Sequence, residues 1–268
     1  MNLGFCSLSS SSSGNCYLIK SETTNLLVDV GISGAKIYKN LANYGIEPSD
    51  ISHVLLTHEH VDHVKSVSPV AKKSPGAVFC CSGGTLEGLG EKGQIIAGRY
   101  CMAVPGEMFM AGDIEVTPFR ISHDAAEPVA YTFQREGKKI AIVTDTGVVT
   151  EEILEAIKGS DLLVMESNHE VNILLYGSYP YNIKRRILSD VGHLSNEAAG
   201  NCILGFLKDL DRCKVPKVLL AHLSQENNTP QQAYITVKNI LEEEDFYVGK
   251  DLSLGVVLKD QLSELIYI

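Results

Sequence analysis

The sequence predicts an α/β protein with one large domain spanning residues 1–268. Apolar runs rich in β-branched residues, typical of buried strands, alternate along the chain with stretches whose apolar residues have helical spacing. With 268 residues, 44% of them hydrophobic and 21% charged, the chain is long enough to bury one sizeable core. It has no internal repeat and no linker-like segment, so we expect no second domain.

Each element rests on a local pattern. Gly45 ends one helix, Pro230 occupies the first turn of another, and Ser195 caps a helix that starts near Asn196. Pro118 places its strand at an edge or at a bulge, and the SSSSSGN segment joins two paired strands. Strands are expected at residues 2–7, 16–19, 26–30, 51–56, 77–80, 113–122, 129–134, 139–143, 162–165 and 215–220, and helices at residues 35–44, 64–73, 85–89, 151–158, 195–210 and 230–244.

The segment 57–63, which reads THEHVDH, carries the strongest functional signal. In an extended loop, residues two apart point to the same side, so His58, His60 and Asp62 can face together while His63 points elsewhere. Such a loop can offer two imidazoles to one metal ion, and a carboxylate plus an imidazole to a neighbouring one. Histidine and aspartate suit zinc, manganese or iron. A solvated surface loop would gain nothing from this spacing.

Further polar residues recur where predicted strands end. Asp29 closes one strand, where it either orients a ligand histidine or serves as a plain turn residue. Because buried sheets place ligands at their strand ends, we expect a site at the rim of a sheet. The other residues at strand ends are His123, Asp145, Glu166 and His222.

Composition limits the class of protein. A net charge of −10 argues against broad electrostatic adhesion to nucleic acid, although local patches are compatible with it. Seven cysteines form no CxxC pair and are odd in number, which suits reduced thiols better than a disulfide framework. The chain starts without a signal-peptide pattern and has no bilayer-length apolar run. We therefore expect a cytoplasmic protein with no membrane contact.

Taken together, these residues resemble the metallo-β-lactamase superfamily over nearly the whole chain. Within it the sequence is most similar to the bacterial YycJ (WalJ) group of exonucleases, with a looser similarity to ribonuclease Z. Two positions depart from the pattern, because Ser10 and Ser66 stand where glycines are expected. The HxHxDH signature stands here as His58, His60, Asp62 and His63, and the group motifs are SSGN at 12–15, SHDAAEP at 122–128, ESNHE at 166–170, GHLSNE at 192–197 and AHLSQENN at 221–228.

The resemblance implies a four-layer αββα sandwich with two divalent metal ions, zinc or manganese, with iron also compatible. It assigns one ion to His58, His60 and His123, the other to Asp62, His63 and His222, and the bridging position to Asp145. Two such ions, about 3.5–4 Å apart, can hold a bridging hydroxide as the nucleophile and stabilise the oxygens of a phosphodiester.

Catalytic roles are expected for three residues. His193 is the candidate to protonate the leaving oxygen, with Glu166 orienting it, and Asp62 completes the set. His169 has three readings: a partner of a ligand, part of the substrate cleft, or a histidine on a helix surface.

The segment 176–186, YGSYPYNIKRR, interleaves tyrosines with cations in an acidic chain. Aromatic rings stack on bases and cations hold phosphates, so the segment is a candidate substrate-binding surface. A solvated helix face is the alternative. The residues expected to hold substrate are Tyr179, Lys184, Arg185, Arg186 and His169.

The function expected is a dinuclear metal-dependent hydrolase that cleaves nucleic acid, with DNA attacked from an end as the favoured reaction through resemblance to the YycJ group. Two alternatives stay open. The fold also hosts hydrolases of small acyl substrates such as thioesters or lactams, and a regulatory binding protein can use it as a scaffold. An intact ligand set is hard to reconcile with a scaffold alone.

Overall fold

The computed structural model describes residues 3–210, 214–259 and 261–268 and divides the chain into two compact units. Unit 1 comprises Met1–Arg120, Ala125–Lys138 and Lys259–Ile268, and unit 2 comprises Ile121–Asp124 and Lys139–Leu258. The single domain expected from the sequence stays a prediction. Among the described residues, no helix is both long and apolar enough to cross a membrane.

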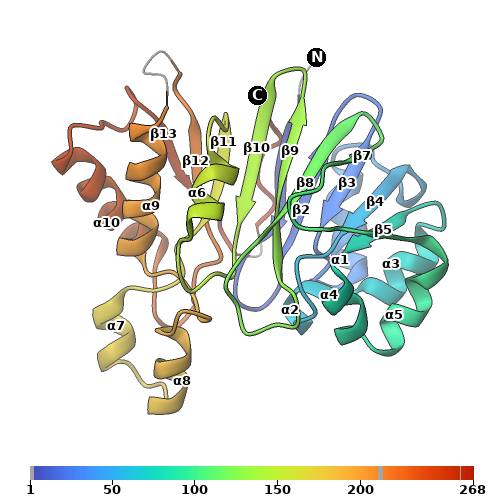
Figure 1. The fold of residues 1–268 in the computed structure, drawn as a ribbon, viewed down its shortest axis with the longest axis horizontal. Coiled ribbons are helices and arrows are strands. Elements are labelled where there is room, and N and C mark those ends of the chain that lie inside the picture. The colour runs from blue at the N-terminus through green and yellow to red at the C-terminus, as the bar shows by residue number, and fades with distance from the viewer. Residues whose placement is uncertain (1–2, 211–213, 260) are drawn as a thin grey trace. The chain divides into compact units, whose positions relative to one another are not determined.

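Unit 1 is built on a seven-stranded mixed sheet (Figure 1). Strands β3 to β6 pair in parallel, whereas β14, β1, β2 and β3 pair antiparallel. Neighbouring parallel strands end at the same edge, so the residues that follow β3 and β4 come together there. In spatial order the strands are β14 (Ile266–Tyr267), β1 (Gly4–Ser9), β2 (Cys16–Lys20), β3 (Asn25–Val28), β4 (Ile51–Leu55), β5 (Val78–Cys81) and β6 (Tyr100–Met102).

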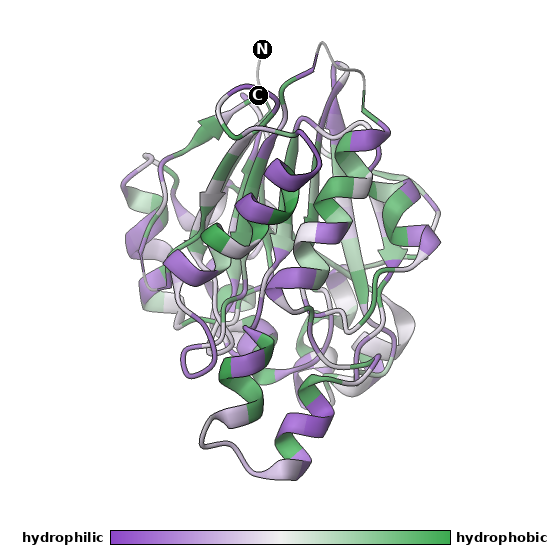
Figure 2. Cartoon of the chain, turned by 90° about the vertical axis from the view of Figure 1, so that its left-hand side faces the viewer, coloured by the Kyte–Doolittle hydropathy of each residue, from purple (hydrophilic) through white to green (hydrophobic). Residues whose placement is uncertain are grey.

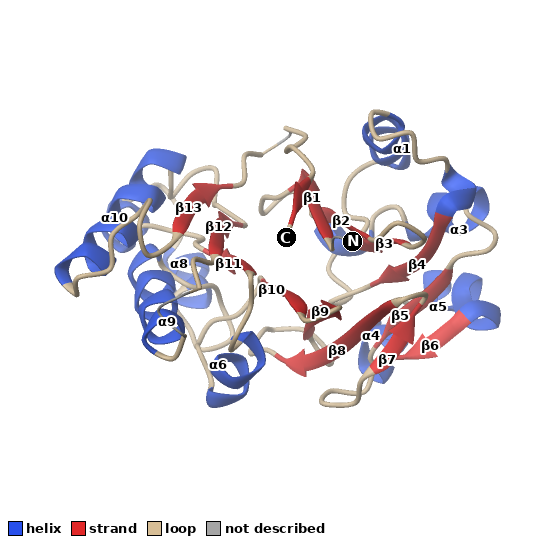
Figure 3. Ribbon diagram, turned by 90° about the horizontal axis from the view of Figure 1, so that it is seen from above, coloured by secondary structure: helices blue, strands red, loops and turns tan. Residues whose placement is uncertain are grey.

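Helices cover one face of this sheet (Figure 3). Ile37 and Leu41 of α1 lie one turn apart and are both buried in the core, which also takes Val67 and Val70 of α3. Ser33 caps α1 by accepting the Lys36 N–H. The helices of unit 1 are α1 (Gly34–Ala42), η1 (Pro48–Asp50), α2 (Val61–Val64), α3 (Val67–Lys73), α4 (Gly83–Gly88), α5 (Glu91–Ile96) and η2 (Ala97–Arg99).

Unit 1 also contains the antiparallel strands β7 (Phe109–Ala111), β8 (Ile114–Arg120) and β9 (Val129–Arg135). Pro118 of β8 pairs with β9, while the pairing of β8 with β7 ends at Val116. On the side of Pro118 away from β9 no strand is paired, so its missing N–H leaves no strand-to-strand hydrogen bond unmade. Its carbonyl accepts the Gly106 N–H at 2.8 Å. Pro118 thus lies in a stretch of β8 that pairs on one side only, although β8 itself is not an edge strand, because it has β9 and β7 as neighbours.

Unit 2 is built on four parallel strands: β10 (Lys138–Val143), β11 (Leu162–Glu166), β12 (Lys217–Ala221) and β13 (Ser253–Val256). The residues of β10, β11 and β12 are mostly apolar and buried, as expected for a parallel sheet. The helices α6 (Glu151–Ile157), α9 (Asn196–Lys208) and α10 (Pro230–Glu243) cover one of its faces (Figure 3). The carboxyl ends of β10, β11 and β12 lie at the same edge of the sheet. The predicted site residues Asp145, Glu166 and His222 stand at these strand ends.

Two short helices of unit 2, α7 (Val171–Tyr176) and α8 (Tyr181–Ile187), project beyond the ends of these strands (Figures 1 and 2). Sequence analysis did not predict them. Only Leu174 of α7 is buried, and α8 buries no residue. Neither helix therefore shows the regular spacing of apolar residues from which a longer helix is predicted. The same limit applies to α5, β6, β7, β13 and β14, all of six residues or fewer.

The predicted strands and helices otherwise correspond to observed ones with shifted ends. The first strand begins at Gly4, while Asn2 lies outside the described residues. The helix expected at 64–73 is two helices, α2 and α3, with Ser66 between them. The six described cysteines are free, consistent with the expectation of reduced thiols; Cys213 lies outside the described residues.

Candidate metal centre

In unit 1, the THEHVDH segment runs from the end of β4 into α2, beside the end of β3. Asp29 follows β3 with a φ of 58°, a left-handed conformation that a non-glycine residue adopts at a cost of about 1–3 kcal/mol. Its backbone N–H donates to Leu55 O at 2.8 Å, which fixes it against the end of β4. This geometry aims the Asp29 carboxylate at the first residues of the loop.

Asp29 orients one of the predicted ligands. Its Oδ2 lies 2.8 Å from Nδ1 of His63, and its two oxygens accept the N–H and the hydroxyl of Thr57 at 2.9 Å each. All three side chains are buried. A histidine whose Nδ1–H is held by a carboxylate presents the lone pair of Nε2, as metal-ligating histidines do. Asp29 therefore holds the His63 ring and is more than a plain turn residue; that His63 binds metal stays a prediction.

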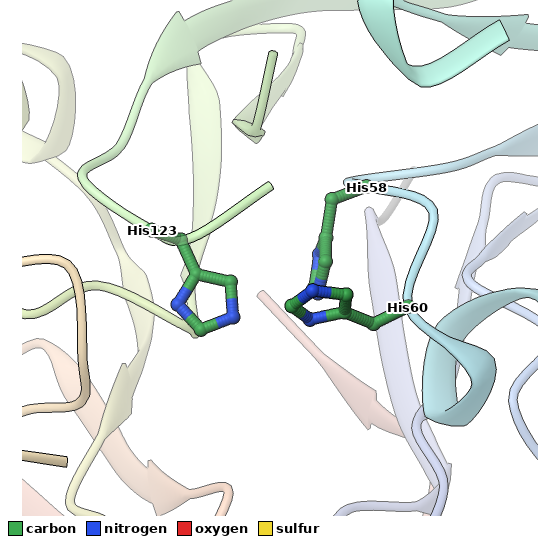
Figure 4. A group of neighbouring side chains, drawn as sticks. All are labelled: His58, His60 and His123. Atoms are coloured by element: carbon green, nitrogen blue, oxygen red, sulfur yellow. The ribbon is translucent and has the colours of Figure 1, made fainter. Parts of the chain in front are cut away.

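Thr57 orients a second imidazole. Because its hydroxyl proton goes to Asp29, its oxygen accepts from Nδ1 of His58 at 3.0 Å. His58 is fully buried, and its ring lies 4.6 Å from that of His60 in an edge-to-face arrangement. Figure 4 shows both rings on the loop after β4, and shows the ring of His123, which follows β8. Sequence analysis gave Thr57 no role, although it stands directly before the HxHxDH signature.

The SSGN motif packs directly on this loop. The Asn15 N–H donates to Asp62 O at 2.8 Å, and its side-chain amide lies 3.1 Å from Nε2 of His63. Ser11 fixes the amide orientation, with N–H donation to Oδ1 at 3.1 Å and carbonyl acceptance from Nδ2 at 3.0 Å. The amide therefore donates to His63 Nε2, which identifies that nitrogen as an acceptor. Gly31 is required here because a Cβ would meet Asp62 O at 1.6 Å.

The two departures from the family pattern are accommodated. Ser10 is buried and its hydroxyl lies 2.7 Å from the Tyr17 hydroxyl. Ser66 is buried and donates its hydroxyl to Ile32 O at 2.6 Å. Both serines find hydrogen-bond partners inside unit 1, so neither leaves a buried hydroxyl unsatisfied.

In unit 2, predicted site residues follow three neighbouring parallel strands. Asp145 comes after β10, Glu166 ends β11, and His222 comes directly after β12. Asp145 and His222 have φ values of 61° and 56°, so three of the five non-glycine residues with positive φ in the described chain are predicted site residues or Asp29. Strained backbone of this kind concentrates at functional sites.

Glu166 is the hub of this cluster. Its Oε1 lies 2.8 Å from Nδ1 of His222 and 2.9 Å from Nδ1 of His193, while its Oε2 accepts the N–H groups of Thr146 and Leu194. Burial alone would raise the pKa of Glu166, but the two imidazoles hold that pKa well below its ordinary value. The carboxylate stays ionised and fixes both histidine rings through Nδ1.

His123 and Asp145 lie in the same cluster. The Nδ1 of His123 donates to Gly192 O at 3.1 Å, and its Nε2 lies 3.4 Å from Asp124 and 3.9 Å from Asp145. Burial lowers the pKa of His123, more than the nearby Asp145 raises it. A neutral imidazole with its Nδ1 proton committed to a carbonyl is the form that binds a metal ion.

The donor set of each unit fits a divalent metal. Ligand atoms of Asp145, Glu166, His193 and His222 in unit 2 all lie within 4.8 Å of one another and are mostly buried. In unit 1, Nε2 of His63 lies 3.5 Å from the Asp62 carboxylate, beside the rings of His58 and His60. Imidazole nitrogens and carboxylate oxygens without thiolate suit zinc, manganese or iron. Unit 1 carries four of the seven predicted ligands and unit 2 carries three.

Three motifs of unit 2 meet in a buried polar network. One asparagine from each takes part: Asn168 of ESNHE, Asn196 of GHLSNE and Asn228 of AHLSQENN. Asn228 donates to Asn196 Oδ1 and to Ser167 O, while Asn168 Nδ2 donates to His222 O at 2.9 Å. The network holds the loops of His193 and His222 together. Sequence analysis quoted these motifs without assigning the asparagines a role.

His169 is only 1% exposed and precedes α7, so the reading of a helix-surface histidine is wrong. Burial lowers the pKa of His169 to about 4, so the ring is neutral near neutral pH. Its carbonyl accepts the Asn196 N–H at 2.9 Å, directly after the Ser195 cap that the sequence predicted for α9. The burial favours a supporting role over direct contact with a substrate.

Two of the three cations predicted to bind substrate have structural partners. Lys184 Nζ donates to the carbonyls of Leu175 and Gly177, both at 2.8 Å. Arg186 forms a two-point ion pair with Asp124, at 2.5 and 3.0 Å. Arg185 is exposed, and Tyr179, before α8, is half-buried. The segment is therefore a folded part of unit 2, joined to the residue next to His123.

The fold and the two donor sets define a class of protein. The chain matches the beta-lactamase superfamily domain over residues 24–222 and belongs to this superfamily. The predicted α/β class with the metallo-β-lactamase fold is confirmed by the structure of YhfI from Bacillus subtilis, which has a TM-score of 0.72 at 17% identity and covers 98% of this chain and 99% of its own.

Two curated relatives narrow the group. The exodeoxyribonuclease YycJ of Bacillus anthracis is 39% identical over 252 residues, which are 93% of each chain. The exodeoxyribonuclease WalJ of Streptococcus pneumoniae is 35% identical over 249 residues, 92% of this chain and 91% of the relative. The resemblance to the YycJ (WalJ) group is confirmed, and the chain is a metal-dependent hydrolase.

Proposed function

We propose that the chain is a dinuclear metal-dependent nuclease that removes nucleotides from the end of a DNA strand. The observation that carries this proposal is the identity of 39% over 93% of the chain with a protein named as an exodeoxyribonuclease, in a chain whose candidate ligands are all present. The oriented imidazoles of both units support it, because a scaffold without catalysis would not need to hold Nδ1 of His58, His63, His123 and His222.

Seven residues are proposed to bind the metal. His58, His60 and His123 would hold one divalent ion, Asp62, His63 and His222 the other, and Asp145 would serve both. When bound, two such ions supply an activated hydroxide and Lewis-acid stabilisation for phosphodiester cleavage. Zinc and manganese both fit the nitrogen and oxygen donors, and iron is compatible with them.

Protein groups supply the remaining chemistry. His193 is proposed to deliver a proton to the leaving oxygen, because its Nδ1 is held by Glu166 at 2.9 Å and its side chain keeps 17% of its surface exposed. Glu166 orients that ring and stabilises its positive charge. Asp62, 28% exposed, belongs with them as a ligand at the reacting centre.

The substrate-binding surface is proposed to be the segment that contains α8. Since the chain carries a net charge of −10, a polyanion has to be held by a local positive site. Tyr179, Lys184, Arg185 and Arg186 lie on this segment, whereas His169, also predicted to bind substrate, is buried in unit 2.

The experiment is an assay of the purified protein with zinc or manganese on end-labelled DNA, on RNA, on a small phosphodiester and on a thioester. We expect stepwise shortening of DNA from an end and hydrolysis of the small phosphodiester. Brisk thioester hydrolysis without cleavage of any nucleic acid would refute the nuclease proposal in favour of an acyl hydrolase.

A further inference from the structure

The three cations of α8 differ in how they are held, and the difference separates anchoring from binding. Lys184 ties α8 to the end of α7 through two carbonyls, and Arg186 ties it to Asp124. The side chain of Arg185 forms no ion pair and no hydrogen bond with any other residue that the structure describes. Because α8 fully buries no residue, these polar contacts contribute to holding the helix in place.

Arg185 shares a helix face with Tyr181, one turn earlier, and the ring of Tyr181 is 76% exposed. A pocket of about 340 Å³ lies on this face, lined by Tyr181, Asn182, Arg185, Arg186 and Ser189. That volume is at the small end of the range of about 300–1,000 Å³ for ligand pockets. Figure 2 shows hydrophilic residues predominating on α8 and hydrophobic residues on α7.

The chemistry of this lining is specific. A guanidinium, an amide and a hydroxyl are donors for phosphate oxygens, and a phenol ring offers a face on which any base can stack. The set contains no carboxylate, in a chain with ten more acidic than basic residues. Recognition of a small acyl group would use none of these features.

Backbone hydrogen bonds join the helix that carries the pocket to the candidate metal-binding loops of unit 2. The last turn of α8 accepts the His193 N–H through Ile187 O at 3.0 Å, and Gly192 O accepts from Nδ1 of His123 at 3.1 Å. Gly192 is required there, since a Cβ would meet Ile187 O at 2.2 Å. A DNA strand bound to α8 would therefore lie on the same segment that positions His123 and His193.

We propose that this pocket is a subsite for one nucleotide of a single DNA strand, away from the scissile bond, with Arg185 on its phosphate and Tyr181 stacked on its base. Lys184 and Arg186 are positioning residues that hold α8. The inference rests on the proposed nuclease function and identifies the part of the chain that binds the DNA strand. It changes the sequence-based prediction, which treated the three cations alike and named Tyr179, rather than Tyr181, as the tyrosine that holds substrate.

The test measures binding of a labelled single-stranded oligonucleotide with cleavage-resistant phosphorothioate linkages, over a range of salt concentrations. Arg185→Ala should weaken binding about 10-fold and reduce the slope of log Kd against log salt by about 0.7. Tyr181→Ala should weaken it about 5- to 100-fold, while Tyr181→Phe, which keeps the ring, should bind as the wild type does. Lys72→Ala, which removes an exposed lysine on α3 that has no partner among the described residues, is the matched control.

Hydrolysis of a small phosphodiester separates the two proposals. In Arg185→Ala and Tyr181→Ala it should fall far less than oligonucleotide affinity does, because a small substrate does not extend to a pocket away from the scissile bond. Wild-type affinity for the oligonucleotide in both variants would overturn the subsite, as would an equal loss on the small phosphodiester. A wild-type enzyme that hydrolyses neither end-labelled DNA nor the small phosphodiester would overturn the nuclease proposal itself, and the subsite with it.

Discussion

Replacing Glu166 by glutamine tests how this protein prepares its histidines for metal. The wild-type carboxylate accepts from Nδ1 of His222 at 2.8 Å and from Nδ1 of His193 at 2.9 Å through one oxygen, and from two backbone N–H groups through the other. A glutamine can keep the two backbone hydrogen bonds with its carbonyl oxygen. Its NH₂ group then faces two ring nitrogens that are both donors in the wild type.

The imidazoles can relieve this conflict only by moving their protons from Nδ1 to Nε2. His222 would then carry a proton on the nitrogen that the proposal assigns to the metal. Loss of a carboxylate that orients a metal-binding histidine costs about 10- to 100-fold in metal affinity, equivalent to about 1.4–2.7 kcal/mol. We expect Glu166→Gln to bind zinc more weakly by this factor while folding as the wild type does.

The assay is a zinc titration in competition with a chromophoric chelator, with thermal unfolding of the metal-free protein recorded in parallel. Glu170→Gln is the matched control, because Glu170 accepts from the side chains of Asn196, Gln232 and Thr236 and from no histidine. Unchanged zinc affinity in Glu166→Gln would refute the reasoning that this carboxylate fixes the ring tautomers. Equal losses in both variants would show that the effect is one of folding.

Three further predictions concern the metal stoichiometry, the division of roles and pH. Protein purified without chelators should carry two metal ions per chain by elemental analysis, and a value near zero after reconstitution would contradict the predicted ligand set. Asp145→Ala should lose the paired site, whereas His193→Ala should keep its metal and slow turnover about 10²- to 10⁴-fold; loss of metal in both would make His193 a ligand instead. Because burial lowers the pKa of His169 to about 4 from an ordinary 6.5, the unfolded chain binds the extra proton in that range, so stability should fall as pH drops from 6.5 to 4. His169→Gln should remove about 3 kcal/mol of that pH dependence in the metal-free protein, and denaturant unfolding at several pH values would show no such difference if the ring were already charged.

The sequence by itself was sufficient to predict the candidate metal ligands. The spacing of THEHVDH and the polar residues after apolar strands identified the candidate ligands, because strand direction and period are short-range properties. Asp29 illustrates the limit. A carboxylate after a strand has two ordinary roles, and only its place beside β4, with His63 at 2.8 Å, decided between them.

Tertiary structure decided which residues support the ligands. Thr57, through its bond to Asp29, and Asn15, Asn168, Asn196 and Asn228 form hydrogen bonds between segments far apart in the chain, and no local pattern encodes such partners. Short helices such as α7 and α8 escaped prediction because too few of their residues are buried to set a period. The basic run at 184–186 was visible in the sequence, but only the fold shows that Lys184 and Arg186 already have partners and that Arg185 does not, since side-chain pairing depends on what packs beside a helix.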